Sequence, residues 1–203
     1  MSVLFGHPSG TPFANNAALA HFESGHLAAY CVPWMPSQTV LALLGTLAPI
    51  RPLIRRFSRR RFAPLDDAPK IQGRVAELRR LVLRAGGGDP HSLAGEANDW
   101  LMRTMARESS RANVTAVHAY EDCSLWQFVE AKRLGKACIY DMPIGYYPAW
   151  ERIQAELAYR YPDWLPANGT STAAYTRPQQ KQREMELADL TLVPSGFAER
   201  TIR

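Results

Sequence analysis

Short apolar segments alternate with helical patterns at both ends of this chain. Apolar runs predict strands over 2–6, 27–32, 114–119, 137–140 and 190–193. The stretches between most of these strands have apolar residues at helical spacing. Strands that alternate with helices form a parallel sheet with helices on both faces. The sequence therefore predicts an α/β, Rossmann-like fold with a mainly parallel sheet.

The chain has 203 residues, of which 46% are hydrophobic and 21% charged. This composition is typical of a globular protein and excludes a disordered, collagen-like or coiled-coil chain. We expect a single domain over residues 1–203, with a basic helical insertion at about 36–110. The last helical pattern has barely begun when the sequence stops at Arg203, so we expect the domain to be a piece of something longer.

Cysteine usage and the apolar runs indicate the compartment. Cys31, Cys123 and Cys138 form no Cys-x-x-Cys pair, which argues against a disulfide scaffold or zinc site and suits a reducing compartment. The longest apolar run, 40–50, has 11 residues, whereas a membrane-spanning helix needs about 20. No basic stretch opens the chain, as an export signal would require. We therefore expect a cytoplasmic protein.

Basic residues are concentrated in one segment. The chain has 24 Lys+Arg and 19 Asp+Glu, but residues 51–84 alone hold 11 basic and 3 acidic side chains. The rest of the chain, with 13 basic and 16 acidic side chains, is slightly acidic. Because the basicity is local, the net charge of +5 does not indicate a nucleic-acid-binding protein.

Polar loops follow four of the predicted strands, at 6–12, 118–124, 141–147 and 194–196. Parallel sheets bind ligands at the carboxyl ends of their strands. We therefore expect these loops to form the functional site.

Three stretches resemble the N-terminal half of family-4-type glycosyltransferases. They read AVHAYEDCSL from Ala116, AKRLGKACIYDMPIGYY from Ala131 and ELADLTLVPSGF from Glu186. The opening HPSG, with two asparagines behind it, fits the first strand–loop–helix of the same family. The resemblance covers residues 1–34 and 112–203, and the basic middle only loosely.

The resemblance implies a retaining, metal-independent hexosyltransferase of the two-domain GT-B type. In such enzymes the N-terminal domain mainly holds the sugar acceptor, and a C-terminal domain mainly holds the nucleotide-sugar donor. We therefore expect a donor-binding domain in the same chain or a partner, no cofactor, and little activity from this chain alone. A catalytically inactive α/β binding module stays open as the alternative.

Two parts of the first loop are candidate substrate contacts. Glycine permits close approach, so the N–H groups of Ser9, Gly10 and Thr11 could lie against a donor phosphate. Asn15 and Asn16 follow at the start of the first helix, where capping the helix competes with contacting the acceptor.

The family places a polar residue against the transferred sugar near the end of the strand that is predicted here over 114–119. His118 stands at that position. A neutral imidazole can donate or accept a hydrogen bond near pH 7, so His118 is the predicted catalytic residue; contact with a loop carbonyl is the alternative. Tyr120 and Glu121 follow as substrate-binding candidates. Adjacent residues on a strand point to opposite faces, so Glu121 and Asp122 do not form a paired acid and base. Glu121 is expected to cap the next helix or fix the loop.

Asp141 directly follows a strand and could bind an acceptor hydroxyl or shape the turn before Pro143. Tyr146 and Tyr147, in the next loop, are candidates to contact the acceptor. The histidines and cysteines lack the spacing of metal ligands, so we predict no metal.

The run 51–62 alternates arginine with apolar residues. Such a surface is attracted to anionic lipid headgroups, which predicts a peripheral location at the inner face of a membrane and suits a lipid-linked acceptor. The charge would serve nucleic acid equally well, and a solvated helix face is the ordinary alternative. The arginines assigned to this contact are Arg55, Arg56, Arg59, Arg60 and Arg61.

Overall fold

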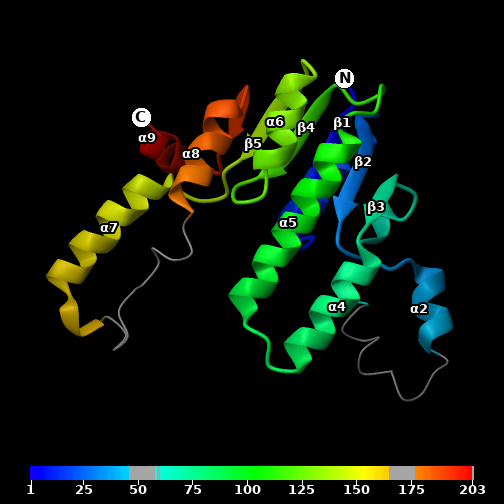
Figure 1. Cartoon of the computed structure of the whole chain (residues 1–203), viewed down its shortest axis with the longest axis horizontal. Helices are drawn as coiled ribbons and strands as arrows, with labels where there is room; N and C mark the ends of the chain where they lie inside the picture. Colours follow the sequence, from blue (N-terminus) through cyan, green and yellow to red (C-terminus); the bar gives the residue numbers. More distant parts are fainter. Residues whose placement is uncertain (46–57, 59, 165–176, 203) are drawn as a thin grey trace.

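A computed structural model describes residues 1–45, 58, 60–164 and 177–202 of the chain. Six strands form one sheet in the order β3-β2-β1-β4-β5-β6, and every neighbouring pair is parallel (Figure 1). The strands are β1 (Val3–Gly6), β2 (Leu27–Val32), β3 (Lys70–Gln72), β4 (Ala116–Tyr120), β5 (Ala137–Asp141) and β6 (Leu190–Leu192). The predicted Rossmann-like α/β fold is confirmed.

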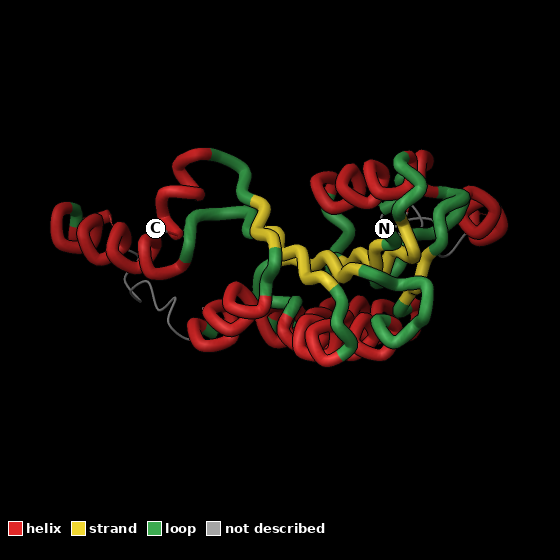
Figure 2. The backbone as a smooth tube through the Cα atoms, turned by 90° about the horizontal axis from the view of Figure 1, so that it is seen from above, coloured by secondary structure: helices red, strands yellow, loops and turns green. Residues whose placement is uncertain are grey.

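Helices lie on both faces of the sheet (Figure 2). One face is covered by α1 (Pro12–Glu23), which packs on β1 and β2 and against the 3-10 turn η2 (Ala63–Leu65). The other face is covered by α5 (Pro90–Glu108), α6 (Leu125–Arg133) and α8 (Pro178–Leu187), with α4 (Arg74–Ala85) packed against α5. The remaining elements are α2 (Gln38–Gly45), α7 (Tyr147–Arg160), η3 (Pro162–Trp164) and α9 (Gly196–Ile202).

Local sequence signals mark the starts of α1 and α5, which both pack on the sheet. Thr11 is the N-cap of α1, where its hydroxyl accepts the N–H of Ala14 at 3.4 Å, and Pro12 opens the helix. At α5, the Asp89 carboxylate accepts the N–H of Ser92 at 2.7 Å. Both caps lie where the chain leaves a Gly-bearing or Pro-bearing loop, so these helix starts follow from the local sequence.

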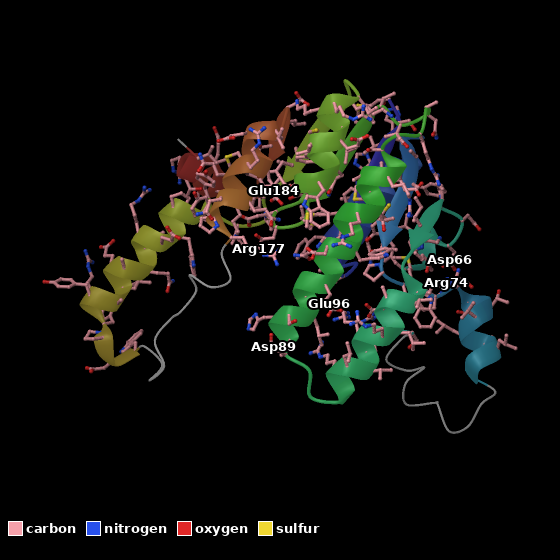
Figure 3. The ribbon with its side chains drawn as sticks, viewed as in Figure 1. Asp66, Arg74, Asp89, Glu96, Arg177 and Glu184 are labelled. Atoms are coloured by element: carbon pink, nitrogen blue, oxygen red, sulfur yellow. The ribbon has the colours of Figure 1, made fainter. Side chains whose placement is uncertain are left out.

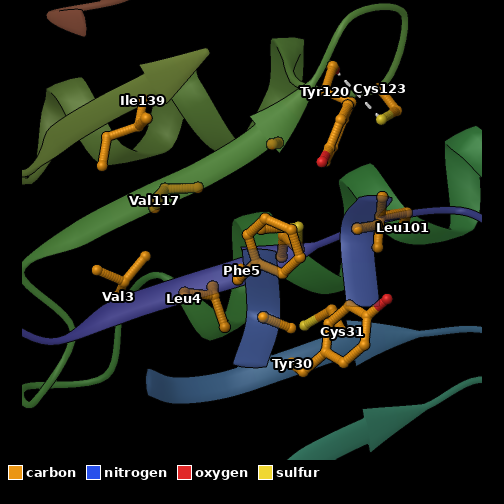
Figure 4. Packing of buried hydrophobic residues seen from close by; sticks show 14 of the residues in the cluster. Val3, Leu4, Phe5, Tyr30, Cys31, Leu101, Val117, Tyr120, Cys123 and Ile139 are labelled. Carbon is orange, nitrogen blue, oxygen red and sulfur yellow. Dashed lines mark hydrogen bonds between the residues drawn. The ribbon is translucent and has the colours of Figure 1, made fainter. Parts of the chain in front are cut away.

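The core is built around β1, which is buried on both faces. Val3, Leu4 and Phe5 are completely buried (Figure 4). Phe5 stands opposite Tyr30 on one neighbouring strand and His118 on the other. A continuous apolar run is what a central parallel strand requires, because helices cover both of its faces.

The segment expected as a helical insertion contributes a strand as well as helices. Strand β3, in this stretch, pairs with β2 at the edge of the sheet. It reads Lys-Ile-Gln and has a single apolar side chain, so no apolar run predicts a strand there. Residues 46–57 and 59 of the expected insertion lie outside the described residues. In the part of the chain that is described, no helix is both long and apolar enough to cross a bilayer.

Gly73, the N-cap of α4, lies against the indole ring of Trp100 on α5. A Cβ at Gly73 would stand 2.4 Å from the nearest atom of that ring. We predict that Gly73→Ala lowers the free energy of unfolding by about 1–3 kcal/mol, because the ring must shift within a packed contact. Gly86, the C-cap of the same helix, has no such neighbour within 3.4 Å and a negative φ.

Urea unfolding measures both variants. Gly86→Ala is the matched control and should change the free energy of unfolding by about 0.5 kcal/mol or less. Equal stability of the two variants would contradict the close approach of α4 and α5.

Candidate functional site

The order in which the strands join the sheet changes side at β1. The chain proceeds from β1 to β2 and β3 on one side, and then from β4 to β5 and β6 on the other. In such a sheet the connecting helices diverge and leave a crevice beyond the carboxyl ends of β1 and β4. Because all six strands are parallel, the loops predicted to form the site do lie along this one edge.

Three side chains from adjacent strands meet at this edge, and we call them the edge cluster: His7, Tyr120 and Asp141. His7 directly follows β1, Tyr120 ends β4 and Asp141 ends β5. The rings of His7 and Tyr120 meet edge-on, with centroids 4.7 Å apart. Burial raises the pKa of Tyr120, and the charge of the neighbouring Asp141 carboxylate adds to the rise. The Asp141 side chain is 20% exposed, so part of the cluster faces solvent.

His7 organises the loop that follows β1. Its Nδ1 accepts the N–H groups of Ser9 and Gly10, each at 3.1 Å. Gly10 adopts φ +61°, a conformation that suits glycine and turns its N–H toward the ring. Thr11 is occupied as the helix cap described above. Two of the three N–H groups predicted to bind a phosphate are therefore bonded to an imidazole of the protein itself.

The protonation state of His7 follows from these bonds and its burial. Burial lowers the pKa of His7 to about 4, although Asp141 acts in the opposite direction. The ring is therefore neutral at pH 7. Because Nδ1 accepts the two N–H bonds, the ring proton is on Nε2, which can donate one hydrogen bond.

The two asparagines predicted to contact the substrate differ in burial. Asn15 is buried; its side-chain NH₂ donates to the Gly10 carbonyl at 3.2 Å, and its oxygen accepts the Tyr30 hydroxyl at 3.0 Å. Asn15 thus ties the first loop to β2 and is not the helix cap, which is Thr11. Asn16 is exposed and stays a candidate acceptor contact.

His118 lies beneath the edge cluster and not at the end of its strand. Strand β4 continues to Tyr120, so His118 is two residues from the end and only 3% exposed. Its Nδ1 lies 2.9 Å from Nε2 of His21 on α1. Its Nε2 has no hydrogen-bond partner among the described residues and lies 3.8 Å from an oxygen of Asp141. The His118 ring therefore lies against the side chains of His21 and Asp141 and is almost completely shielded from solvent.

A largely buried acid–lysine cluster adjoins this site and comprises Glu121, Asp122, Lys181 and Glu184. The Lys181 ammonium lies 3.2 Å from Glu121 and 3.4 Å from Asp122. The adjacent carboxylates reach the same lysine because Asp122, with φ +69°, has left the strand. The expectation that they point to opposite faces is therefore wrong. Burial raises the pKa of Glu121 and of Asp122, against the opposing effect of Lys181.

Glu184 occupies the N-terminal end of α6 (Figure 3). Its carboxylate accepts the N–H groups of Asp122 at 2.9 Å, Ser124 at 3.0 Å and Leu125 at 3.2 Å. Glu184 is completely buried, and burial raises its pKa while these hydrogen bonds offset part of the rise. A helix N-terminus favours a negative charge, and here the protein supplies it. The capping role expected for Glu121 therefore belongs to Glu184.

Tyr146 and Tyr147 pack together beside α9. Their rings meet with centroids 4.9 Å apart, and the Tyr146 N–H donates to the hydroxyl of Thr201 at 2.7 Å. Burial raises the pKa of Tyr146. Both rings are partly exposed, so they stay candidates for acceptor contact.

Two of the five arginines predicted to meet lipid are described by the structure, and both are paired. Arg60 is paired with Glu77, and Arg61 is paired with Asp66. Arg55, Arg56 and Arg59 lie outside the described residues. The two described arginines therefore serve internal ion pairs.

Other chemistry finds little support among the described residues. Burial raises the pKa of Cys31 and Cys123, and that of Cys138 to about 11, so these thiols are poor nucleophiles. No group of three or more His, Cys, Asp or Glu side chains in this part of the chain could hold a metal ion. A cavity of about 440 Å³ between α4 and α5, and one of about 240 Å³ between α7 and α9, are lined by other residues than those predicted.

The comparisons with protein families, curated proteins and solved structures found no match to this chain.

Three contributors to the site escaped the sequence reasoning: His7, Lys181 and Glu184. His7 could have been found, because it directly follows the first strand. Lys181 and Glu184 stand one helical turn apart on α8, a spacing that puts both on one face. Their partners lie about sixty positions earlier, and no local signal connects the two segments.

We predict that Glu184→Gln lowers the free energy of unfolding by about 1.5–3 kcal/mol, the range for hydrogen bonds to a charged group. A glutamine would replace one acceptor oxygen by an NH₂ group that faces backbone N–H donors. Glu186→Gln is the matched control on the same helix, since Glu186 is exposed and its partners Gln182 and Arg183 are exposed side chains of α8 itself. Urea unfolding at pH 7 should show little change in the control, and a similar loss in both would contradict the assignment.

The partly buried His7 predicts a loss of stability as the pH falls. The fold keeps the ring neutral down to about pH 4, whereas the unfolded chain protonates it below about pH 6.5. Stability that is present above pH 6.5 should therefore be lost toward pH 4. His7→Gln should lose about 2 kcal/mol less than the wild type between pH 6.5 and 4.5, as measured by urea unfolding at each pH. Parallel pH profiles would contradict the burial of a neutral ring.

Proposed function

We propose that this chain holds the sugar acceptor of a retaining glycosyltransferase. The observation that supports this most is the edge cluster, which brings His7, Tyr120 and Asp141 together at the carboxyl ends of three adjacent strands. This is the position at which Rossmann-like sheets bind ligands. The resemblance of the flanking sequences to family-4-type glycosyltransferases supplies the reaction class.

The edge cluster has the hydrogen-bonding groups that a sugar needs. The neutral His7 can donate from Nε2, and the Asp141 carboxylate can accept from a sugar hydroxyl. Tyr120 lies between them: its ring meets that of His7, and the Asp141 carboxylate is close enough to raise its pKa. Ser9, Asn16, Tyr146 and Tyr147 are the partly or fully exposed candidates around this cluster. Glu121 ties the loop after β4 to α8 through its ion pair with Lys181.

The donor phosphate is proposed to bind outside this chain. The N–H groups of Ser9 and Gly10 are bonded to His7, and the start of α6 is filled by Glu184. Both places could otherwise attract an anion. The nucleotide sugar is therefore proposed to be held by a second domain, in the same chain or in a partner, and to react without a metal.

The catalytic role expected of His118 takes an indirect form in this proposal. Its ring is buried between His21 and Asp141, 3.8 Å from an oxygen of the latter. His118 would orient the Asp141 carboxylate from beneath and would not touch the sugar. It is then a positioning residue.

A binding module without catalytic activity is the second candidate. The occupation of both potential phosphate sites by His7 and Glu184 favours it, because such a module needs no donor. The two candidates differ in one measurable respect. Only the glycosyltransferase gains transferase activity when a donor-binding domain is present.

Sugar binding to the 203-residue chain tests the proposal directly. Methyl α-D-glucopyranoside and methyl α-D-mannopyranoside are suitable probes, and amide NMR shifts report where they bind. We predict shifts at the edge cluster and about tenfold weaker binding in Asp141→Asn, since a hydrogen bond to a charged group is lost. His118→Gln should weaken binding only about threefold, because it acts through Asp141.

Asp163→Asn is the control, since Asp163 is exposed on η3 far along the sequence from the cluster. The chain alone should release no nucleotide from UDP-glucose or GDP-mannose. Saturable binding of either donor that exceeds binding of the glycosides would contradict the proposed division of roles. So would shifts confined to residues away from the edge cluster.

A further inference from the structure

Helix α4 turns its apolar side away from the protein. Val75, Leu78 and Val82 are 84%, 51% and 65% exposed. Their spacing of three and four residues places them on one stripe of the helix. A surface helix of a globular protein normally turns such a stripe toward the core. Here the stripe faces solvent, and an exposed apolar stripe of this kind marks an interaction surface.

The inner side of α4 is charged. Glu77 is 2% exposed, and its carboxylate accepts two hydrogen bonds from Arg80, at 2.7 and 2.8 Å, and one from Arg60. Burial would raise the pKa of Glu77, but the two arginines outweigh it and lower the pKa. Because ion pairs face inward, the orientation of α4 is fixed with its valines outward.

Arginines flank the exposed stripe. Helical spacing places Arg74 and Arg79 on either side of it. Both are exposed, as is Arg84 in the last turn. Arg79 pairs with Glu96 of α5 at 2.9 Å, but both side chains are largely exposed, and such surface pairs contribute little. Glu77 is the sole acidic residue of α4 in the sequence, and it is buried. The outer face of α4 therefore presents apolar and cationic groups together.

We infer that the outer face of α4 docks on an anionic membrane surface. A helix that combines an apolar stripe with flanking arginines lies in the headgroup region, where the apolar side chains enter the lipid and the arginines meet anionic headgroups. This inference does not depend on the proposed glycosyltransferase function. It also assigns the membrane contact to α4, since Arg60 and Arg61 of the run 51–62 are held in internal ion pairs.

Two other occupants fit α4 less well. Nucleic acid would use the arginines but would gain nothing from the exposed valines. A second copy of the chain, packed stripe to stripe about a two-fold axis, would bring Arg74 and Arg79 of both copies together. Like charges across such an interface are unfavourable. The lipid surface satisfies the apolar and the cationic groups at once.

Vesicle co-sedimentation of the 203-residue chain tests the apolar part. Vesicles of phosphatidylcholine with phosphatidylglycerol should bind the wild type, and pure phosphatidylcholine should bind it much more weakly. Val75→Asp with Val82→Asp should weaken binding by about tenfold for each valine replaced. Val129→Asp is the matched control, since Val129 is 49% exposed on the outer side of α6. Circular dichroism should show equal helix content in all three proteins.

The arginines are tested separately. Arg74→Gln with Arg79→Gln should weaken binding to the anionic vesicles about fivefold for each arginine, and should reduce the dependence of binding on salt. Arg133→Gln on α6 is the matched control, because Arg133 is likewise exposed and pairs with a glutamate. Binding that is unchanged in the α4 variants and lost in the α6 variants would overturn the assignment.

Three further outcomes would also overturn it. Equal binding to neutral and anionic vesicles would remove the role of the arginines. Failure to bind vesicles, together with a dimer in light scattering that Val75→Asp and Val82→Asp dissociate, would make the stripe a self-interface. Failure to bind vesicles, together with salt-dependent binding of poly(U) that the valine variants retain, would make the surface one for nucleic acid.

Discussion

The parallel pairing of β1 with both β2 and β4 is the constraint on which the rest of this structure depends. Because β1 is central, its side chains must be apolar on both faces, and Val3, Leu4 and Phe5 satisfy that condition. Parallel pairing also directs every carboxyl end to one edge. His7, Tyr120 and Asp141 meet there although they are far apart in the sequence.

The carboxyl edge is held together by polar groups that the protein provides to itself. His7 accepts the N–H groups of its own loop, and Glu184 accepts those at the start of α6. In many parallel sheets such N–H groups would be available to a phosphate. Here they are used to fix the loops, and the groups left to meet a ligand are Nε2 of the neutral His7 and the Asp141 carboxylate. In the proposed function these two groups would bind the hydroxyls of a sugar acceptor.

Helix α4 breaks the rule that a surface helix buries its apolar side, and the break has a structural cause. Glu77 reaches inward to Arg80 and Arg60, and these buried ion pairs hold the valines outward. A conflict between local pattern and tertiary placement is typical of functional surfaces. The exposed stripe of α4 and the edge cluster lie on different elements, so the two surfaces can be tested independently by substitution.

The sequence by itself determined the fold class, because the period of the apolar residues and the Gly and Pro breaks are local properties of the chain. The strands that carry the edge, and the loops that follow them, were predictable for the same reason. Strand β3 was not, since Lys70–Gln72 has a single apolar residue and forms no apolar run. Only the tertiary structure placed His118 beneath the site, because the end of β4 depends on pairing with β5 as far as Asp141. Only the tertiary structure joined Glu184 to the start of α6, because the N–H groups that it accepts are distant in the sequence. Only the tertiary structure turned the apolar stripe of α4 outward, because the ion pairs of Glu77 lie on the opposite face of that helix.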